Sequence, residues 1–149
     1  MLHIEESAVI DARTEDVYAV IRDYEVGHPA ILPKPYFTGV TVLEGGIGAG
    51  TKVRVDMNVM GRKSAFTATI TEPQPGRLLN ESSPVEGIST DFIFEPLANG
   101  TKTRLTFRTD MRLPAGAAGF IQSLLLKPLM RRMYKEELAL INAYLRPSA

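Results

Sequence analysis

The chain has 149 residues, with 17 basic and 17 acidic side chains and a formal net charge of zero. This balance gives no general attraction to nucleic acid. The absence of cysteine excludes disulfides, thiolate zinc sites, iron–sulfur ligation and cysteine nucleophiles. The length predicts a single domain, residues 1–149, that is large enough to bury a core.

The sequence carries no signal for secretion or membrane insertion. Residues 1–11 have neither a basic start nor an unbroken apolar run, so they do not resemble a signal peptide. The most apolar stretch, residues 120–130, is too short to cross a bilayer and contains Lys127 and Pro128. We therefore expect a soluble, cytoplasmic protein with no stable membrane insertion.

A strand at residues 3–11 and two short helices are predicted first. Thr14 is a suitable N-terminal cap for a helix over residues 14–23. This helix is amphipathic, because one of its faces collects Val17, Val20, Ile21 and Tyr24. A second short helix is expected over residues 25–31, before a proline-rich segment.

Six further strands are predicted, separated by clear turn signals. The connections are short, which favours antiparallel neighbours over parallel strands with helical crossovers. Asn99 and Gly100 form the dipeptide best suited to a tight hairpin. The expected ranges are 36–44, 51–60, 63–72, 77–83, 88–95 and 101–112.

Alternating apolar residues assign one face of each strand to the interior. The opposite face, with Arg54, Arg104 and Arg108, should be mostly exposed. The expected inward side chains are Val53, Val55, Met57, Val59, Phe66, Ala68, Ile70, Thr90, Phe92, Phe94, Thr103, Leu105, Phe107, Thr109 and Met111.

The strand at residues 77–83 has an ambiguous phase, because Leu78 and Leu79 point to opposite faces. A shift of one residue exchanges the inward polar groups. Either Asn80 and Ser82 or Glu81 therefore faces the interior.

A long helix over residues 120–145 is predicted to cover the sheet. Pro128 removes one backbone hydrogen bond and clashes with the carbonyl of Leu124, so it should kink the helix or set its start near Lys127. A long helix on a curved sheet often leaves a hollow between the two layers. That hollow is the expected functional site.

The glycine-rich run at residues 44–51 invites comparison with a phosphate-binding loop. Such a loop requires a helix directly after it, so that backbone amides point at the anion. The residues that follow alternate as a strand, and no Gly-Lys-Ser/Thr is present. A flexible hairpin connection is the favoured interpretation.

The sequence has only two histidines, and they lack the spacing of a helical metal-binding pair. His3 should be solvated near the start of an edge strand. His28, between Gly27 and Pro29, could line the mouth of a cavity or be an ordinary loop residue. We expect no metal and no cofactor, and no Ser-His-Asp triad can be argued.

The last helix also carries basic side chains. They offer a surface for anionic lipid, or simply form the solvated face of a helix that packs on the core. The apolar stretch 120–130 could act as a lid with Gly116 and Gly119 as hinges, or pack under the sheet. The basic residues are Lys127, Arg131, Arg132 and Lys135.

Five segments share the pattern of a known family: DARTEDVYAVIRDYE, VTVLEGGIGAGTKVRV, FTATITEPQPGRLL, FIFEPLANGTKTRLTF and MRRMYKEELALINAYL. With them the chain resembles the START-like superfamily (SRPBCC), in particular its polyketide cyclase/dehydrase and lipid transport proteins. The resemblance covers nearly the whole chain. It implies an α+β helix-grip fold, with seven antiparallel strands curled around a long C-terminal helix and two short helices between strands 1 and 2. It also implies a pocket between sheet and helix for a lipid, polyketide or aromatic molecule.

The expected partner is a small hydrophobic molecule held in this pocket; neither its identity nor the oligomeric state follows from the sequence. An enzyme such as a cyclase, dehydratase or aromatase is the alternative, and a membrane- or protein-interaction module is another. The enzyme would use polar groups in the pocket, for which the candidates are His28, Tyr36, Asn80, Glu81, Thr90 and Tyr134. The predicted ligand-binding residues are His28, Tyr36, Val55, Met57, Phe66, Ile70, Asn80, Thr90, Phe92, Phe107, Met111, Leu125, Leu129, Met133 and Tyr134.

Overall fold

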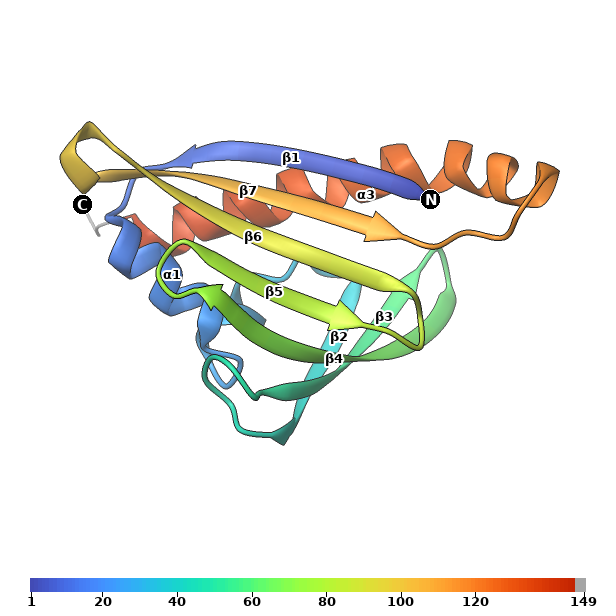
Figure 1. Ribbon diagram of the computed structural model, residues 1–149, viewed down its shortest axis with the longest axis horizontal. Helices are drawn as coiled ribbons and strands as arrows, with labels where there is room; N and C mark the ends of the chain where they lie inside the picture. The colour runs from blue at the N-terminus through green and yellow to red at the C-terminus, as the bar shows by residue number, and fades with distance from the viewer. Residues whose placement is uncertain (147–149) are drawn as a thin grey trace.

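The computed structural model describes residues 1–146 of the chain. It contains seven strands, two short helices between the first two strands, and a long C-terminal helix (Figure 1). The elements are β1 Leu2–Ile10, α1 Thr14–Arg22, α2 Gly27–Ala30, β2 Phe37–Glu44, β3 Lys52–Val59, β4 Arg62–Gln74, β5 Leu78–Ser83, β6 Ile88–Leu97, the 3₁₀ turn η1 Ala98–Gly100, β7 Lys102–Met111 and α3 Ala117–Leu145.

The strands form one sheet in the order β1-β7-β6-β5-β4-β3-β2, and every pair is antiparallel. The predicted α+β class with a seven-stranded antiparallel sheet is confirmed. Strands β2 to β7 follow one another as hairpin-connected neighbours, as the short turns predict. The first strand then returns beside the last one, so β1 and β2 form the two edges of the sheet.

Two local predictions need correction. Thr14 is the first residue of α1, and Arg13 before it makes no side-chain capping bond. The Thr14 hydroxyl is instead buried and accepts a hydrogen bond of 3.1 Å from Thr103. Asn99 and Gly100 do not form a two-residue hairpin, because they belong to η1 between the paired residues Leu97 and Lys102.

The core lies on the concave face of the sheet, where the predicted alternation places it. Phe94, Leu105 and Phe107 are fully buried there, and each such apolar side chain contributes about 1.5–3 kcal/mol relative to exposure. Arg54 and Arg104 stand on the opposite, exposed face. The period of two along each strand therefore separates core from solvent.

The structure resolves the ambiguous phase of β5. Leu79, Glu81 and Ser83 share the inner face, because Glu81 pairs with Ile70 on β4 and with Thr90 on β6. Asn80 lies on the outer face, where its amide donates to Ser89 (3.0 Å) and Asp91 (2.7 Å). The prediction that Asn80 faces the pocket is wrong, and Glu81 takes that place.

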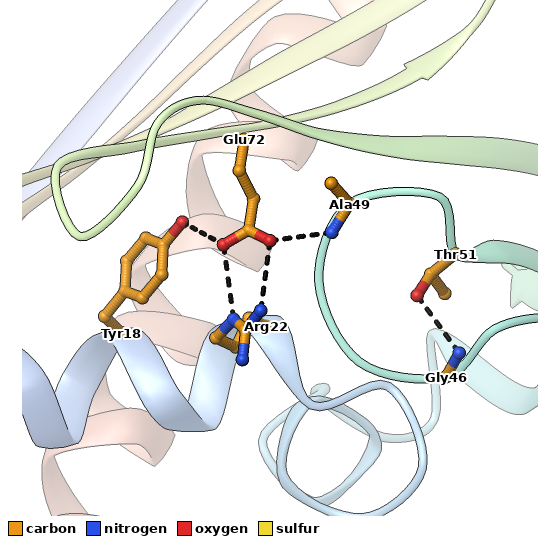
Figure 2. Close-up of polar contacts among 6 residues, drawn as sticks. All are labelled: Tyr18, Arg22, Gly46, Ala49, Thr51 and Glu72. Carbon is orange, nitrogen blue, oxygen red and sulfur yellow. Dashed lines mark hydrogen bonds and ion pairs between the residues drawn. The ribbon is translucent and has the colours of Figure 1, made fainter.

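The glycine-rich run at residues 44–51 connects β2 to β3 and is tied to β4 by a carboxylate (Figure 2). Glu72 accepts hydrogen bonds from the Ala49 amide (2.7 Å), from Nε (3.2 Å) and Nη2 (3.1 Å) of Arg22, and from the Tyr18 hydroxyl. The Gly46 amide donates to Thr51 Oγ1 at 3.1 Å. The loop is thus a hairpin connection, as predicted from the strand that follows it. It is also held against α1 by these contacts, which the sequence did not predict.

Helix α3 begins at Ala117 and passes through Pro128, which excludes a start near Lys127, one of the two effects expected of this proline. The carbonyl of Leu124 loses its partner at Pro128, but Leu124 is 59% exposed, and water can satisfy a carbonyl there. Gly119 is buried in the first turn, and a Cβ on it would lie 1.7 Å from the carbonyl oxygen of Pro114. Gly119 therefore permits close packing of the first turn against Pro114, and a lid with Gly116 and Gly119 as hinges stays a prediction.

The long helix packs mainly along the edge strand β1, with smaller contacts to α1. Figure 1 shows α3 running lengthwise beside β1 and β7, while β2, β3 and β4 curve away from it. The concave face of β3 to β6 is therefore not filled by the helix.

Candidate functional site

A cavity of about 500 Å³ lies between this concave face and α3. Volumes of 300–1,000 Å³ are usual for sites of small molecules. The walls are apolar for the most part, with side chains from the sheet on one side and from α3 on the other. The apolar lining consists of Leu32, Phe37, Val40, Val55, Met57, Val59, Ala65, Phe66, Ala68, Ile88, Phe92, Met111, Leu126, Leu129, Met130 and Met133.

Most of the residues predicted for ligand binding line this cavity. Their roles in binding stay predictions, because the structure fixes only their positions. They are His28, Val55, Met57, Phe66, Thr90, Phe92, Met111, Leu129, Met133 and Tyr134.

The other predicted residues lie elsewhere, each for a packing reason. Ile70 and Phe107 are fully buried in the solid core beside the cavity, and Phe107 packs edge-to-face on Phe92 and Tyr134. Leu125 is 70% exposed, because Leu126 and Leu129 occupy the inner side of α3. Tyr36 precedes β2 and, like Asn80 on the outer face of β5, is not part of the lining.

The cavity has an exposed end and a buried end. Arg62, Ser64, Glu86 and Gln122 line it and are exposed, so the opening lies near the β3–β4 and β5–β6 turns and the first half of α3. On the first half of α3, Phe120, Ile121, Leu124 and Leu125 are between 57% and 70% exposed. They are not packed under the sheet, and a membrane- or protein-binding role for this surface stays a prediction.

Four polar side chains meet at the buried end. Tyr24 stacks on His28, with ring centroids 4.5 Å apart, and its hydroxyl donates to Glu81 Oε2 at 2.8 Å. Glu137 of α3 approaches from the helix side, with its Oε1 3.8 Å from Nε2 of His28. His28 and Glu137 are each 4% exposed. Residues from α2, α3 and β5 are thus brought together by the fold.

The hydrogen bond of His28 determines its orientation. Its Nδ1 lies 2.7 Å from the backbone oxygen of Ile21, and a carbonyl only accepts, so Nδ1 carries the proton. In the neutral ring Nε2 is then an acceptor that faces Glu137. His28 is therefore neither an ordinary loop histidine nor a residue of the cavity mouth, because it lies in α2 and lines the cavity at its buried end.

Burial gives Glu137 unusual properties. Loss of solvation, together with the nearby charge of Glu81, raises the pKa of Glu137 well above its ordinary value. Burial, followed by the charge and hydrogen bond of Glu81, likewise raises the pKa of Tyr24. No hydrogen bond to the Glu137 carboxyl is present among residues 1–146.

Three hydroxyl groups form a second polar cluster beside the first. The Thr90 and Thr109 hydroxyls are 2.8 Å apart, and Thr109 Oγ1 lies 2.5 Å from the Tyr134 hydroxyl. Burial raises the pKa of Tyr134 to about 12 against the lowering effect of these threonines, so its hydroxyl stays protonated at neutral pH. Ser83, also in the lining, has a buried hydroxyl with no hydrogen-bond partner in the described part of the chain.

Glu137 and Tyr24 were not predicted as site residues. A signal for Glu137 exists, since it lies four positions after Met133 and four before Ile141, on the buried stripe of α3. One carboxylate in an apolar stripe indicates a buried polar site. Tyr24 lies on the predicted apolar face with Val17 and Ile21, which gave no reason to separate it from the core.

Residues 1–146 hold no cluster of three or more histidine, aspartate or glutamate side chains arranged for a metal ion. His3 lies on the edge strand β1, exposed and paired with Asp110, away from the cavity. No helix in this part of the chain combines the length and apolar character required to cross a bilayer.

A family model described as polyketide cyclase/dehydrase and lipid transport matches residues 1–146. The chain belongs to this family. Family and fold are consistent with binding of a hydrophobic ligand or with a cyclase-type activity. Comparison with curated proteins gives no match.

Solved structures support the fold of this family member. The KanY protein, determined by NMR in solution, is 23% identical over 97% of both chains, with a TM-score of 0.83. TTHA0849 from Thermus thermophilus is 20% identical over 96% of both chains (TM-score 0.79). A START superfamily protein from Mycobacterium smegmatis is 14% identical over 96% of both chains (TM-score 0.69). The predicted START-like fold is confirmed.

Proposed function

We propose that the protein binds a small hydrophobic molecule, such as a lipid, polyketide or aromatic compound, and carries or senses it. The observation that supports this function is the cavity of about 500 Å³, which has apolar walls and opens at one end. Burial of apolar ligand surface at about 25 cal/mol per Å² supplies the driving force.

The methionines in the wall suit an irregular ligand. Met57 and Met111 come from the sheet, and Met130 and Met133 come from α3, so flexible thioether side chains line both sides. Methionine adapts to different apolar shapes because it has three rotatable bonds and a polarisable sulfur.

Native mass spectrometry of gently purified protein tests this function. We expect a fraction of the protein to carry a co-purified small molecule, which organic extraction removes and identifies. The extracted protein should then bind the neutral fluorescent probe N-phenyl-1-naphthylamine, and the extracted compound should displace it. Absence of both co-purified ligand and probe binding would contradict the proposal.

An enzymatic role in the same cavity is the second candidate. Four of the polar groups named for it, His28, Glu81, Thr90 and Tyr134, line one cavity, and Glu137 adds a buried carboxyl beside His28. Acid–base groups in a site shielded from water suit a cyclase, dehydratase or aromatase reaction. The test is to incubate the extracted ligand with fresh protein and follow its mass and its chromatographic retention, because a cyclisation without dehydration conserves mass. Loss of water, or conversion to an isomer of equal mass, that stops in the Glu137→Gln variant supports catalysis. Unchanged mass and unchanged retention contradict it.

A further inference from the structure

The buried end of the cavity holds a carboxyl that makes no hydrogen bond within the described part of the chain. Glu137 is 4% exposed and lines the cavity, and its Oε1 lies 3.8 Å from Nε2 of His28, beyond hydrogen-bond distance. Ser83 ends β5 beside the β5–β6 turn and therefore lies toward the opening; it also lines the cavity, and its buried hydroxyl has no partner in the same residues. A buried polar group without a partner costs about 1–3 kcal/mol. A ligand group that binds Glu137 removes this cost.

The side chains that face Glu137 are an imidazole and a second carboxylate. Nε2 of His28 lies 3.8 Å from Glu137 Oε1, and in the neutral ring it is an acceptor, because Nδ1 donates to the carbonyl of Ile21. Glu81 stands nearby, with one carboxylate oxygen bonded to Tyr24. The buried end therefore offers carboxyl and imidazole acceptors to whatever enters it.

Within the described residues, the lining has no lysine or arginine near this end. Among residues 1–146, Arg62 is the only lysine or arginine that lines the cavity. Arg62 and Ile70 lie on the same strand, eight positions apart, which is about 26 Å of extended chain, and Ile70 is the β4 partner of Glu81. A ligand carboxylate or phosphate at the buried end would face Glu81 and Glu137 without a lysine or arginine to pair with.

We propose that the buried end recognises a basic nitrogen, so that the ligand is a hydrophobic amine whose ammonium or amine group lies between Glu137 and Glu81 and whose apolar part extends toward the opening. This inference rests on the proposed ligand-binding function and specifies which end of the molecule enters first. The ammonium group donates hydrogen bonds to the carboxyl groups of Glu137 and Glu81. Each buried charge thereby gains a partner of opposite sign.

Three probes with the same apolar chain test the inference: dodecylamine, dodecanol and dodecanoate, each below its aggregation concentration. Binding is measured by displacement of N-phenyl-1-naphthylamine and by titration calorimetry. The wild-type protein should bind dodecylamine at least roughly tenfold more tightly than either other probe.

Substitution of Glu137 and Glu81 tests whether these carboxylates cause the preference for dodecylamine. Glu137→Gln should reduce the preference for dodecylamine over dodecanol, measured as the ratio of the two affinities in the same variant, by roughly tenfold. Glu81→Gln should act in the same direction. The matched control is Glu136→Gln, because Glu136 is the neighbouring carboxylate on α3 and pairs with Arg132 on the solvent side. This control should leave all three affinities unchanged.

The outcomes separate this inference from the proposed function. Equal binding of the three probes, or tighter binding of dodecanoate or dodecanol, overturns the amine preference and leaves the hydrophobic site intact. A preference that persists in the Glu137→Gln/Glu81→Gln double variant also overturns it. Failure of all three probes and of N-phenyl-1-naphthylamine to bind contradicts the proposed function itself.

Discussion

Glu137 shows how one residue links stability to the site. The folded state must keep this carboxyl away from water, which raises its pKa well above the ordinary value of 4.5. A raised pKa contributes stability that is complete below the unfolded pKa and is lost as the pH rises through the folded pKa. Glu137 therefore becomes increasingly unfavourable to folding above pH 4.5.

The Glu137→Gln variant should consequently be more stable than the wild type at neutral and alkaline pH. The difference in the free energy of unfolding should grow with pH from about 5 upward and reach about 2 kcal/mol, because the neutral amide needs no proton. Urea unfolding at several pH values measures it, with Glu136→Gln as the control. A difference that does not change with pH would contradict the burial of this carboxyl.

At the scale of elements, Glu72 joins α1, the glycine-rich loop and β4 (Figure 2). Its burial by itself would raise its pKa, but hydrogen bonds from Arg22, Tyr18 and the Ala49 amide outweigh this effect and lower the pKa to about 2. A depressed pKa contributes stability that is present above the unfolded pKa of 4.5 and is lost as the pH falls toward 2. Acid should therefore loosen this junction.

Glu72→Gln should lower the free energy of unfolding at pH 7 by about 2 kcal/mol, since hydrogen bonds to a charged partner are lost. The variant should also lose less stability than the wild type between pH 4.5 and 2. Acid titration followed by circular dichroism, with hydrogen exchange at the Ala49 amide, measures both effects. Glu44→Gln is the control, because Glu44 forms only an exposed pair with Lys52. Equal acid sensitivity of Glu72→Gln and wild type would refute this role.

The two halves of α3 should respond differently to the same substitution. Leu125 is 70% exposed, whereas Leu138 is 3% exposed in the core. We expect Leu125→Ala to change stability by less than about 0.5 kcal/mol. Leu138→Ala should cost about 2–5 kcal/mol, because it leaves a cavity. Urea denaturation measures the free energy of unfolding of both variants. A large loss in Leu125→Ala would mean that the first half of α3 packs against the sheet.

At the scale of the whole molecule, the cavity follows from where the last helix lies. Helix α3 packs along the edge strand β1, so the curved face of β3 to β6 keeps an uncovered volume. Ala68 of β4 lines this volume, so a larger side chain at this position tests whether the volume is empty.

Ala68→Met should fill part of the cavity. In a solid core such a substitution costs about 1–3 kcal/mol, whereas in this structure we expect a loss below about 1 kcal/mol and several-fold weaker binding of N-phenyl-1-naphthylamine. Thermal unfolding and probe titration measure the two effects. Ala19→Met, on the exposed face of α1, should change neither. Strong destabilisation with unaltered probe binding would show that Ala68 belongs to the packed core.

The sequence by itself determined the strands, the antiparallel pairing of neighbours joined by short turns, and most inward side chains. These features depend on local backbone geometry. Side chains alternate between the two faces of a strand, so Val55 on β3 and Phe66 on β4 take the inner face whatever packs against the sheet. Turn residues between the strands likewise determine hairpin connections. The family resemblance supplied the expectation of a pocket. Ten of the fifteen residues predicted to bind the ligand line the cavity, and their roles in binding stay predictions.

Only the tertiary structure decided the chemistry of the buried end. The local sequence does not decide whether Asn80 or Glu81 faces inward. The pairing of Glu81 with Ile70 and Thr90 places Glu81 on the inner face. Glu137 met His28 because α3 lies along β1, a long-range packing that no local pattern encodes. The same packing left the first half of α3 in solvent. Periodicity identifies the face on which a side chain lies, but only contacts between distant elements determine what that side chain meets.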